Sequence, residues 1–465
     1  MFISSAHVFD RISRHINFEK VKNRGEFTLD SMKMLAELAN HPERSAPVIH
    51  IAGSKGKGSV AAYCAGILEE AGFTCARYAS PHAADWRERV TVGAAFFDES
   101  IYLEAGDELF SVMERFMERT KETASPTFFE LMTMYFFLCA RKARCDVMVV
   151  ETGMGGRLDA TNIVDPLVSV ITLIEKEHTE YLGDTLALIA GEKAGIIKPG
   201  RPVALAEQRQ EAYDVFAKRA GEQGARLYYL PGNARLEHIR LFPDKTSFRL
   251  VPAWLPAPSG PLALSVPAPG VVQAYNAALA VLAATVAFPR MSPEAITAGL
   301  AKTALIARFE KICDDPLVII DGAHTGSSIA ACADTWTTLY GKAAGSAACA
   351  TGVLLFGCVA DKDVSAMASI LFPLFSHIII TRPGTFKTSF PEKVYAVFAE
   401  LEKAEGGRLP RKPGSIRFEP ETRKAIAQAL SLGWEKKAPV LATGSFYLAG
   451  EVISYMKNNW KPTGE

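Results

Sequence analysis

A glycine-rich segment near the N-terminus, G-S-K-G-K-G-S at residues 53–59, has the residue types that bind phosphate. Glycines allow a tight turn in which backbone N–H groups point at phosphate oxygens. The ammonium group of Lys57 could reach the terminal phosphates of a nucleotide, and the hydroxyl of Ser59 could help to hold Mg²⁺. A plain glycine-rich turn is the alternative. The predicted nucleotide-binding residues of this loop are Gly53, Gly56, Lys57, Gly58 and Ser59.

A second group of chemically active residues follows later apolar runs. Glu151 ends the run at 146–150 directly before a glycine-rich turn, and His178 follows the run at 167–173. Lys193 comes fifteen positions after His178. A carboxylate, an imidazole and hydroxyls around a triphosphate can hold Mg²⁺. Each residue also has a structural interpretation: a strand-end charge for Glu151, a capping or core histidine for His178, and a solvated helix lysine for Lys193.

Short apolar runs that alternate with helical patterns must position these residues. The runs are apolar on both faces, which is typical of a parallel sheet covered by helices. Ligands of such sheets bind at the carboxyl ends of the strands, so the loop, Glu151 and His178 should meet at one edge. The expected strands are 48–52, 75–79, 146–150, 167–173 and 202–205.

The rest of the chain indicates a second domain. Residues 226–251 have the pattern of antiparallel strands, and six prolines between 252 and 269 exclude a long helix or a central strand there. A helical stretch at 273–287 ends at Phe288-Pro289, and apolar runs then recur at 317–320, 353–356, 378–381 and 440–443. We predict an α/β protein: a P-loop parallel-sheet ATPase domain at 1–288, then a smaller Rossmann-like domain at 289–465.

Composition narrows the class of protein. Lysine plus arginine and aspartate plus glutamate each number 51, so no net charge draws the chain to nucleic acid or anionic lipid. The eight cysteines are scattered without a C-x-x-C pair, as expected of buried side chains in a reducing compartment. No apolar run approaches about 20 residues, and the N-terminus has no signal-peptide core. We expect a cytoplasmic protein without nucleic-acid or membrane partners.

Longer motifs occur along residues 50–450 in a fixed order. They are HIAGSKGKGS (50–59), ASPH (79–82), RERV (87–90), TFFE (127–130), ETGMGGRLDATN (151–162), EHTEYLG (177–183), EKAGIIKPG (192–200), QAYNAA (273–278), RFE (308–310), DGAH (321–324), FGCVADKD (356–363) and TGSFYL (443–448). In these motifs the chain resembles the folylpolyglutamate synthase and dihydrofolate synthase family of the Mur ligase superfamily.

The resemblance implies a reaction and its participants. ATP would phosphorylate a carboxylate of a folate or pteroate, and the amino group of L-glutamate would attack the acyl phosphate. The resemblance implies two Mg²⁺ sites and carbamylation of Lys193. The catalytic residues would be Lys57, Lys193 and His324. The residues that would hold ATP across the domain boundary are Asn276, Arg308 and Asp321. The residues that would contact Mg²⁺ are Ser59, Ser80, Glu151, His178 and Lys193.

The chain also departs from the family pattern near the expected cleft. The family usually has Asn where Lys55 stands, Asp at Glu177, His at Val272, and Asn-Pro in place of Thr325-Gly326. These departures leave the acceptor open, and we expect a monomer that prefers a reduced folate already carrying glutamate. The expected substrate contacts are Phe27, Trp86 and Thr152, although Phe27 could instead be a core residue. The alternatives are a Mur-type ligase for another carboxylate and a nucleotide-binding regulator that has lost catalysis.

Overall fold

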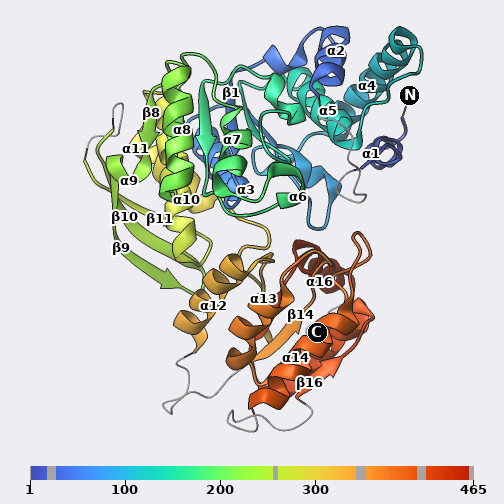
Figure 1. Ribbon diagram of the computed structural model, residues 1–465, viewed down its shortest axis with the longest axis vertical. Helices are drawn as coiled ribbons and strands as arrows, with labels where there is room; N and C mark the ends of the chain where they lie inside the picture. Colours follow the sequence, from blue (N-terminus) through green and yellow to red (C-terminus); the bar gives the residue numbers. More distant parts are fainter. Residues whose placement is uncertain (1, 18–27, 255–259, 342–351, 406–414, 460–465) are drawn as a thin grey trace.

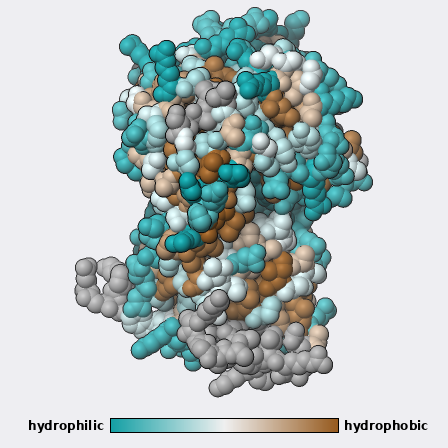
Figure 2. All heavy atoms as spheres, turned by 90° about the vertical axis from the view of Figure 1, so that its left-hand side faces the viewer, coloured by the Kyte–Doolittle hydropathy of each residue, from teal (hydrophilic) through white to brown (hydrophobic). Residues whose placement is uncertain are grey.

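The computed structural model describes residues 2–17, 28–254, 260–341, 352–405 and 415–459. Figure 1 shows two α/β lobes with a further sheet beside the first, and the surface narrows between the lobes in Figure 2. This further sheet has three strands. The α/β class and the order of the two sheets confirm the predicted fold class. None of the helices in these described residues combines the length and the hydropathy of a membrane span.

The first sheet has eight strands in the order β4-β3-β2-β5-β1-β6-β7-β8. Six of them are parallel, and β3 and β4 add an antiparallel edge. The bounds are β1 Val48–Ala52, β2 Cys75–Tyr78, β3 Val90–Val92, β4 Ala95–Phe96, β5 Val147–Glu151, β6 Val168–Ile171, β7 Val203–Leu205 and β8 Leu227–Tyr229. The five predicted strands are confirmed with small shifts at their ends.

Helices cover both faces of this sheet because its strands are apolar on both faces. In β5, Val147 and Val149 pack in the core beneath α3 and α10, whereas Met148 and Val150 pack in the core beneath α5. The helices are α1 Ser5–Ser13, α2 Asp30–Leu38, α3 Lys57–Glu70, α4 Glu99–Thr120, α5 Phe128–Lys142, α6 Thr179–Leu182, α7 Leu186–Ala194, α8 Gln210–Glu222, α9 Leu230–Asn233, α10 Val271–Ala287 and α11 Pro293–Lys302. Short 3₁₀ helices are η1 Pro42–Arg44, η2 Trp86–Arg89 and η3 Ala160–Ile163.

The antiparallel prediction for 226–251 is correct for two strands and wrong for one. β9 (Ala234–Phe242) and β10 (Lys245–Pro252) form an antiparallel pair, but β8 joins the parallel sheet beside β7. In the proline-rich segment, β11 (Leu262–Val266) lies at the edge of the sheet β11-β10-β9. Prolines at 261 and 267 flank it, which fits an edge position and not a central one.

The second lobe is a six-stranded sheet in the order β12-β13-β17-β14-β15-β16, parallel except for β12. Its strands are β12 Glu310–Asp314, β13 Leu317–Ile320, β14 Val353–Phe356, β15 His377–Ile380, β16 Ile416–Phe418 and β17 Val440–Thr443. One face packs against α12 Gly326–Tyr340, α13 Val364–Leu371 and α14 Pro391–Glu405. The other face packs against α15 Thr422–Lys436 and α16 Phe446–Asn459, and η4 spans Phe372–Leu374.

The packing of helix α11 does not agree with the domain boundary expected at residue 288. It lies after that residue, yet Ala295, Ile296 and Leu300 are buried in the same core as α3 and α10. The same core extends to Leu305, whereas Ala307 packs in a core of the second lobe. We therefore propose a domain boundary directly after Leu305, because a domain is defined by its own core.

Candidate functional site

A cavity of about 1640 Å³ lies between the two lobes and is lined by residues of both. From the first lobe, the glycine-rich loop, Ser80, Glu151 and His178 line it. From the second lobe, Arg308 and His324 reach its wall. The predicted meeting of the loop, Glu151 and His178 at one sheet edge is therefore found, because β1, β5 and β6 are neighbouring parallel strands.

The glycine-rich loop connects β1 to α3 and leaves no room for side chains at two positions. Gly53 has φ of 150°, and a Cβ there would lie 1.8 Å from Oγ1 of Thr172. Gly56 has φ of 90°, and its Cβ would lie 2.5 Å from Oδ1 of Asn276. The N-terminus of α3, which begins at Lys57, lines the cavity, and a helix N-terminus is a suitable place for an anion. Asn276 reaches the loop from α10.

Two lysines meet at the carbonyl oxygen of Gly53. Nζ of Lys57 lies 3.0 Å from it, and Nζ of Lys193 lies 2.8 Å from it. Lys193 is 1% exposed and lies behind the cavity wall, where it also contacts Oε1 of Glu177 at 3.1 Å. Burial lowers the pKa of Lys193 to about 8. Burial alone would raise the pKa of Glu177, but the charges of Lys193 and Lys57 lower it to about 2.

Glu151 ends β5 as a buried carboxylate at the cavity. Burial raises its pKa to about 6, although the charge of Lys57 and the backbone N–H of Ser80 favour the ionised form. Its Oε2 atom is buried and has no hydrogen-bond partner among the residues that the structure describes. A Cβ at Gly58 would lie 3.5 Å from that oxygen, so the start of α3 passes close to it. This oxygen is a donor atom available to a cation.

His178 lies at the N-cap of α6 with a left-handed φ of 48°. Its capping position agrees with the structural interpretation, but no side-chain capping hydrogen bond forms, and the residue lines the cavity. Burial lowers its pKa to about 4, so the imidazole is neutral near pH 7. A neutral imidazole can act as a metal ligand.

The second lobe contributes a cation and a histidine to the cavity. Nη1 of Arg308 bonds the carbonyl oxygen of Ala307 at 3.0 Å, and the guanidinium lies 5.1 Å from the ring centre of Phe446. Nδ1 of His324 lies 2.8 Å from the carbonyl oxygen of Gly322. Burial, with a contribution from the charge of Lys55, lowers the pKa of His324 to about 3.

Some of the expected ligand contacts do not line the cavity. Among the described residues, the predicted contacts that are absent from its wall are Gly53, Lys193, Asn276, Asp321, Trp86 and Thr152. Asp321 instead accepts hydrogen bonds from the N–H groups of Phe309 (2.8 Å) and Ala323 (2.7 Å), so it fixes the loops beside Arg308. Phe27 lies outside the described residues.

The geometry of Trp86 and Thr152 does not support the substrate contacts expected for them. Trp86 stacks on Phe9 at 5.1 Å and packs against Tyr102 and Tyr135 in the core beneath α4 and α5. Thr152 is fully buried. An indole or a hydroxyl can pack in a core or contact a ligand. Residue type alone therefore does not distinguish a core residue from a substrate contact.

The cavity wall also contains residues that the sequence did not single out. Phe129 brings an aromatic ring to the wall and packs on Gly153, where a Cβ would lie 2.4 Å from the ring. Lys362, Lys387 and Tyr447 reach the wall from the second lobe. Phe129, Lys362 and Tyr447 lie inside motifs quoted above, so these motifs could have identified them as site residues. Lys387 lies in none of the motifs.

Three of the departures from the family pattern, Lys55, Glu177 and Thr325, lie on the cavity wall. Lys55 lines it, and burial lowers the pKa of this lysine. Thr325 caps α12 in a capping box with Ser328. Oγ of Ser327 donates to Oε2 of Glu175 at 2.5 Å and so joins the two lobes. Val272 is exposed on α10.

In the described part of the chain, no group of three or more His, Cys, Asp or Glu side chains gathers as a metal cluster. The acidic groups at the cavity are instead interleaved with Lys55, Lys57 and Arg308. The cations on this wall suit a ligand that brings its own negative charge. A nucleotide triphosphate that shares Mg²⁺ with the protein has this property.

Comparisons with known proteins agree with these features. The family model of the Mur ligase middle domain matches residues 51–284, and that of the "Mur ligase, glutamate ligase domain" matches residues 307–446. The folylpolyglutamate synthase of Lacticaseibacillus casei is 30% identical over 427 residues, which cover 90% of this chain and 92% of that protein. The dihydrofolate synthase/folylpolyglutamate synthase of Bacillus subtilis is 35% identical over 317 residues, or 66% of this chain and 71% of that protein.

A solved structure shares the whole fold. The folylpolyglutamate synthase of Mycobacterium tuberculosis, complexed with ADP and AMPPCP, superposes with a TM-score of 0.85 at 25% identity. The match covers 98% of this chain and 99% of that one. The likeness therefore includes both lobes and not only the glycine-rich loop.

Proposed function

The chain belongs to the folylpolyglutamate synthase and dihydrofolate synthase family of Mur ligases, and we propose from this premise that it joins L-glutamate to a folate at the expense of ATP. The observation that carries the proposal is the cavity between the lobes. It unites a phosphate-binding loop, the carboxylate of Glu151 and the imidazole of His178 with Arg308 and His324 of the other lobe. Both lobes are needed to complete this set.

The chemistry requires activation of an unreactive acid. A carboxylate oxygen of the folate attacks the γ-phosphorus of ATP, and ADP leaves. The amino group of glutamate then attacks the carbonyl carbon of the acyl phosphate, loses a proton and displaces phosphate, which forms the amide. Phosphoryl transfer between anions depends on positioning and on positive charge around the transferring group. The α3 N-terminus, Lys57 and Arg308 supply that charge at the cavity.

Mg²⁺ fits the donor atoms on the first-lobe side of the cavity. Oε2 of Glu151 is buried without a hydrogen-bond partner among the described residues, and α3 passes beside it. One or two carboxylates together with substrate phosphates are the usual surroundings of Mg²⁺. When bound, the ion neutralises negative charge on the phosphates. The residues that would hold it are Ser59, Ser80, Glu151 and His178.

Lys193 is the residue that would carry a carbamate and support a second Mg²⁺. Carbamylation needs a neutral amine, whose lone pair attacks CO₂ with loss of a proton, and burial that lowers the pKa of Lys193 to about 8 favours the neutral amine. The resulting anion would lie beside Glu177, and Lys57 at the shared Gly53 carbonyl would offset part of that charge.

His324 and Arg308 act from the second lobe. Arg308 would bind ATP, and His324 would lie near the reacting groups with its ring held by Gly322. Closing the two lobes on the ligands would exclude water and protect the acyl phosphate from hydrolysis. The enzyme would work as a monomer, since the cavity is built from one chain.

The test is glutamate-dependent release of ADP. Dihydropteroate, tetrahydrofolate and tetrahydrofolate monoglutamate are each offered with ATP, Mg²⁺ and L-glutamate, and then without glutamate. We expect turnover only with glutamate, and the highest kcat/KM with the monoglutamate. Best turnover with dihydropteroate would overturn that preference. Turnover only with a non-pterin acid would indicate a Mur-type ligase of another substrate, and nucleotide binding without turnover would indicate a regulator.

A further inference from the structure

The second lobe makes a backbone contact with the first lobe at Gly450. A Cβ at this position in α16 would lie 1.9 Å from the carbonyl oxygen of Ala83 and 2.7 Å from its carbonyl carbon. No residue other than glycine fits there while the two backbones are this close. Glycine inside a helix costs roughly 1 kcal/mol relative to alanine. The helix therefore carries a destabilising residue at the point where the lobes touch.

Aromatic contacts lie beside this point. The imidazole of His82 packs edge-on against Phe386 with ring centres 6.2 Å apart. Phe386 in turn stacks on Tyr447 of α16 at 4.8 Å. On the first lobe, Nε of the buried Arg89 donates to Nδ1 of His82 at 2.8 Å. The segment 80–85 therefore contacts the second lobe through both backbone and side chain.

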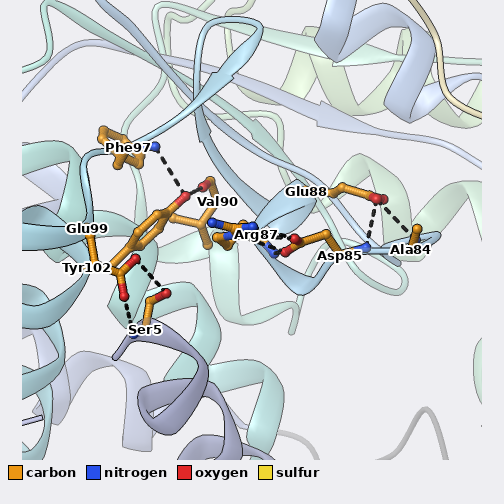
Figure 3. A network of polar contacts seen from close by, with 9 residues as sticks. All are labelled: Ser5, Ala84, Asp85, Arg87, Glu88, Val90, Phe97, Glu99 and Tyr102. Carbon is orange, nitrogen blue, oxygen red and sulfur yellow. Dashed lines mark hydrogen bonds and ion pairs between the residues drawn. The ribbon is translucent and has the colours of Figure 1, made fainter. Parts of the chain in front are cut away.

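The carboxylate of Glu88 fixes the shape of segment 80–85. Its Oε2 accepts from the N–H of Ala83 at 2.6 Å, and its Oε1 accepts from the N–H groups of Ala84 (3.0 Å) and Asp85 (2.9 Å). Figure 3 shows Glu88 turned towards Ala84 and Asp85, with Arg87 paired to the Asp85 carboxylate. One side chain thus holds three consecutive amides of the segment.

A polar network anchors the base of this segment in the first lobe. The hydroxyl of Tyr102 in α4 donates to the carbonyl oxygen of Val90 at 2.6 Å, directly after η2. Glu99 at the start of α4 accepts from the N–H and the hydroxyl of Ser5 in α1 (Figure 3). The chain directly after η2, which carries Glu88, is therefore held from the first-lobe side.

The opposite end of the same segment reaches the proposed metal carboxylate. The backbone N–H of Ser80 stabilises the charged form of Glu151, and both residues line the cavity. Only residues 81 and 82 separate Ser80 from Ala83, which touches Gly450. A displacement of Ala83 would therefore be transmitted over a short, clamped stretch of chain to Ser80.

We propose that segment 80–85 and Gly450 form a seat on which the second lobe docks, and that Gly450 and Glu88 are positioning residues of the ligase. Docking brings Arg308 and His324 towards the phosphate-binding loop and holds Ser80 beside Glu151. The catalytic importance of Gly450 and Glu88 rests on the proposed function. The docking of the second lobe on segment 80–85 rests only on the contacts described above.

Gly450→Ala is the direct test, with Gly221→Ala as its matched control. Both replace a glycine within a helix, but a Cβ at Gly221 in α8 meets no atom within 4 Å. We expect Gly450→Ala to lower kcat by about 10- to 100-fold, since a misplacement of about 1 Å at a reacting centre can cost 100-fold. Its Tm should equal or exceed that of the wild type. Gly221→Ala should keep the wild-type kcat.

Small-angle X-ray scattering in ADP and Mg²⁺ measures docking without turnover. We expect wild type and Gly221→Ala to share one radius of gyration and Gly450→Ala to show a larger one. A Gly450→Ala protein with the control's radius of gyration and a kcat within twofold of it would overturn the proposal. If wild type shows no folate-dependent ADP release but Gly450→Ala still expands, the seat stands and the substrate assignment fails.

Glu88→Gln provides a second route that leaves α16 unchanged. The amide keeps one acceptor oxygen for the three backbone N–H groups, so segment 80–85 should loosen. We expect a smaller fall in kcat than for Gly450→Ala, and a partial increase in the radius of gyration. If Gly450→Ala does not fold, Glu88→Gln is the test of the proposal. A Glu88→Gln protein with the kcat and the radius of gyration of wild type would then overturn it.

Discussion

Glu151→Gln should change the stability of the metal-free protein in a way that depends on pH. Burial raises the pKa of this carboxyl to about 6 from the usual 4.5 of a glutamate. The folded protein therefore binds this proton more tightly than the unfolded chain does. The stabilisation is fully present below pH 4.5 and is lost as the pH rises through 6, because the buried group must then ionise. Glutamine does not titrate and shows no such loss.

The size of the effect follows from the burial of the group. A pKa of about 6 in place of 4.5 corresponds to about 2 kcal/mol, at 1.36 kcal/mol for each pKa unit. Glutamine also changes local hydrogen bonding, because its amide donates where Oε2 of Glu151 has no partner in the described residues. That contribution is the same at every pH. The pH dependence of the difference in unfolding free energy between wild type and variant therefore reports only the ionisation of Glu151.

The assay is denaturant unfolding of wild type and Glu151→Gln at several pH values from 4.5 to 8, with a chelator present. Relative to the variant, wild type should lose about 2 kcal/mol of unfolding free energy across this range. A difference that stays constant with pH, or that moves in favour of wild type as the pH rises, would refute the reasoning about burial.

Three further substitutions test the cavity. Lys57→Ala should lower kcat by about 100-fold or more in a folded protein, because a charge at the transferring phosphoryl is lost; a near-native kcat would show that the loop is misassigned. Lys193→Ala should abolish activity and remove a ¹³C carbamate resonance that wild type shows in ¹³C-bicarbonate; wild type without that resonance would contradict carbamylation. Arg308→Ala should raise the KM for ATP about tenfold or more with little change in Tm, since a hydrogen bond to a charged group contributes about 1.5–3 kcal/mol; an unchanged KM counts against it.

The sequence predicted the first-lobe side of the site because local patterns determine it. An apolar run, closely spaced glycines and a helical pattern describe β1, the loop and α3 without any distant contact. The same holds for Glu151, since β5 is apolar on both faces and the residue ends it. Strand ends in a parallel sheet meet at one edge, so topology alone brought these groups together.

The parts that depend on distant packing were not predictable from patterns. The apolar spacing of α11 does not say which core it joins, and only its packing with α3 assigned it to the first lobe. Trp86 is an aromatic residue directly before the RERV motif, yet its neighbours Phe9 and Tyr102 place it in a core. Gly450 in a helix looks like a weak helix former until Ala83 is seen against it.

The most direct test of the central claim follows an oxygen atom through the reaction. Tetrahydrofolate monoglutamate with ¹⁸O in its side-chain carboxylates is incubated with the protein, ATP, Mg²⁺ and L-glutamate. Mass spectrometry should find the folate extended by one glutamyl group and one ¹⁸O atom in each phosphate released, because that oxygen leaves with the acyl phosphate. Glutamylated product with unlabelled phosphate would contradict the acyl-phosphate route, and the absence of any glutamylated product would contradict folate ligation itself.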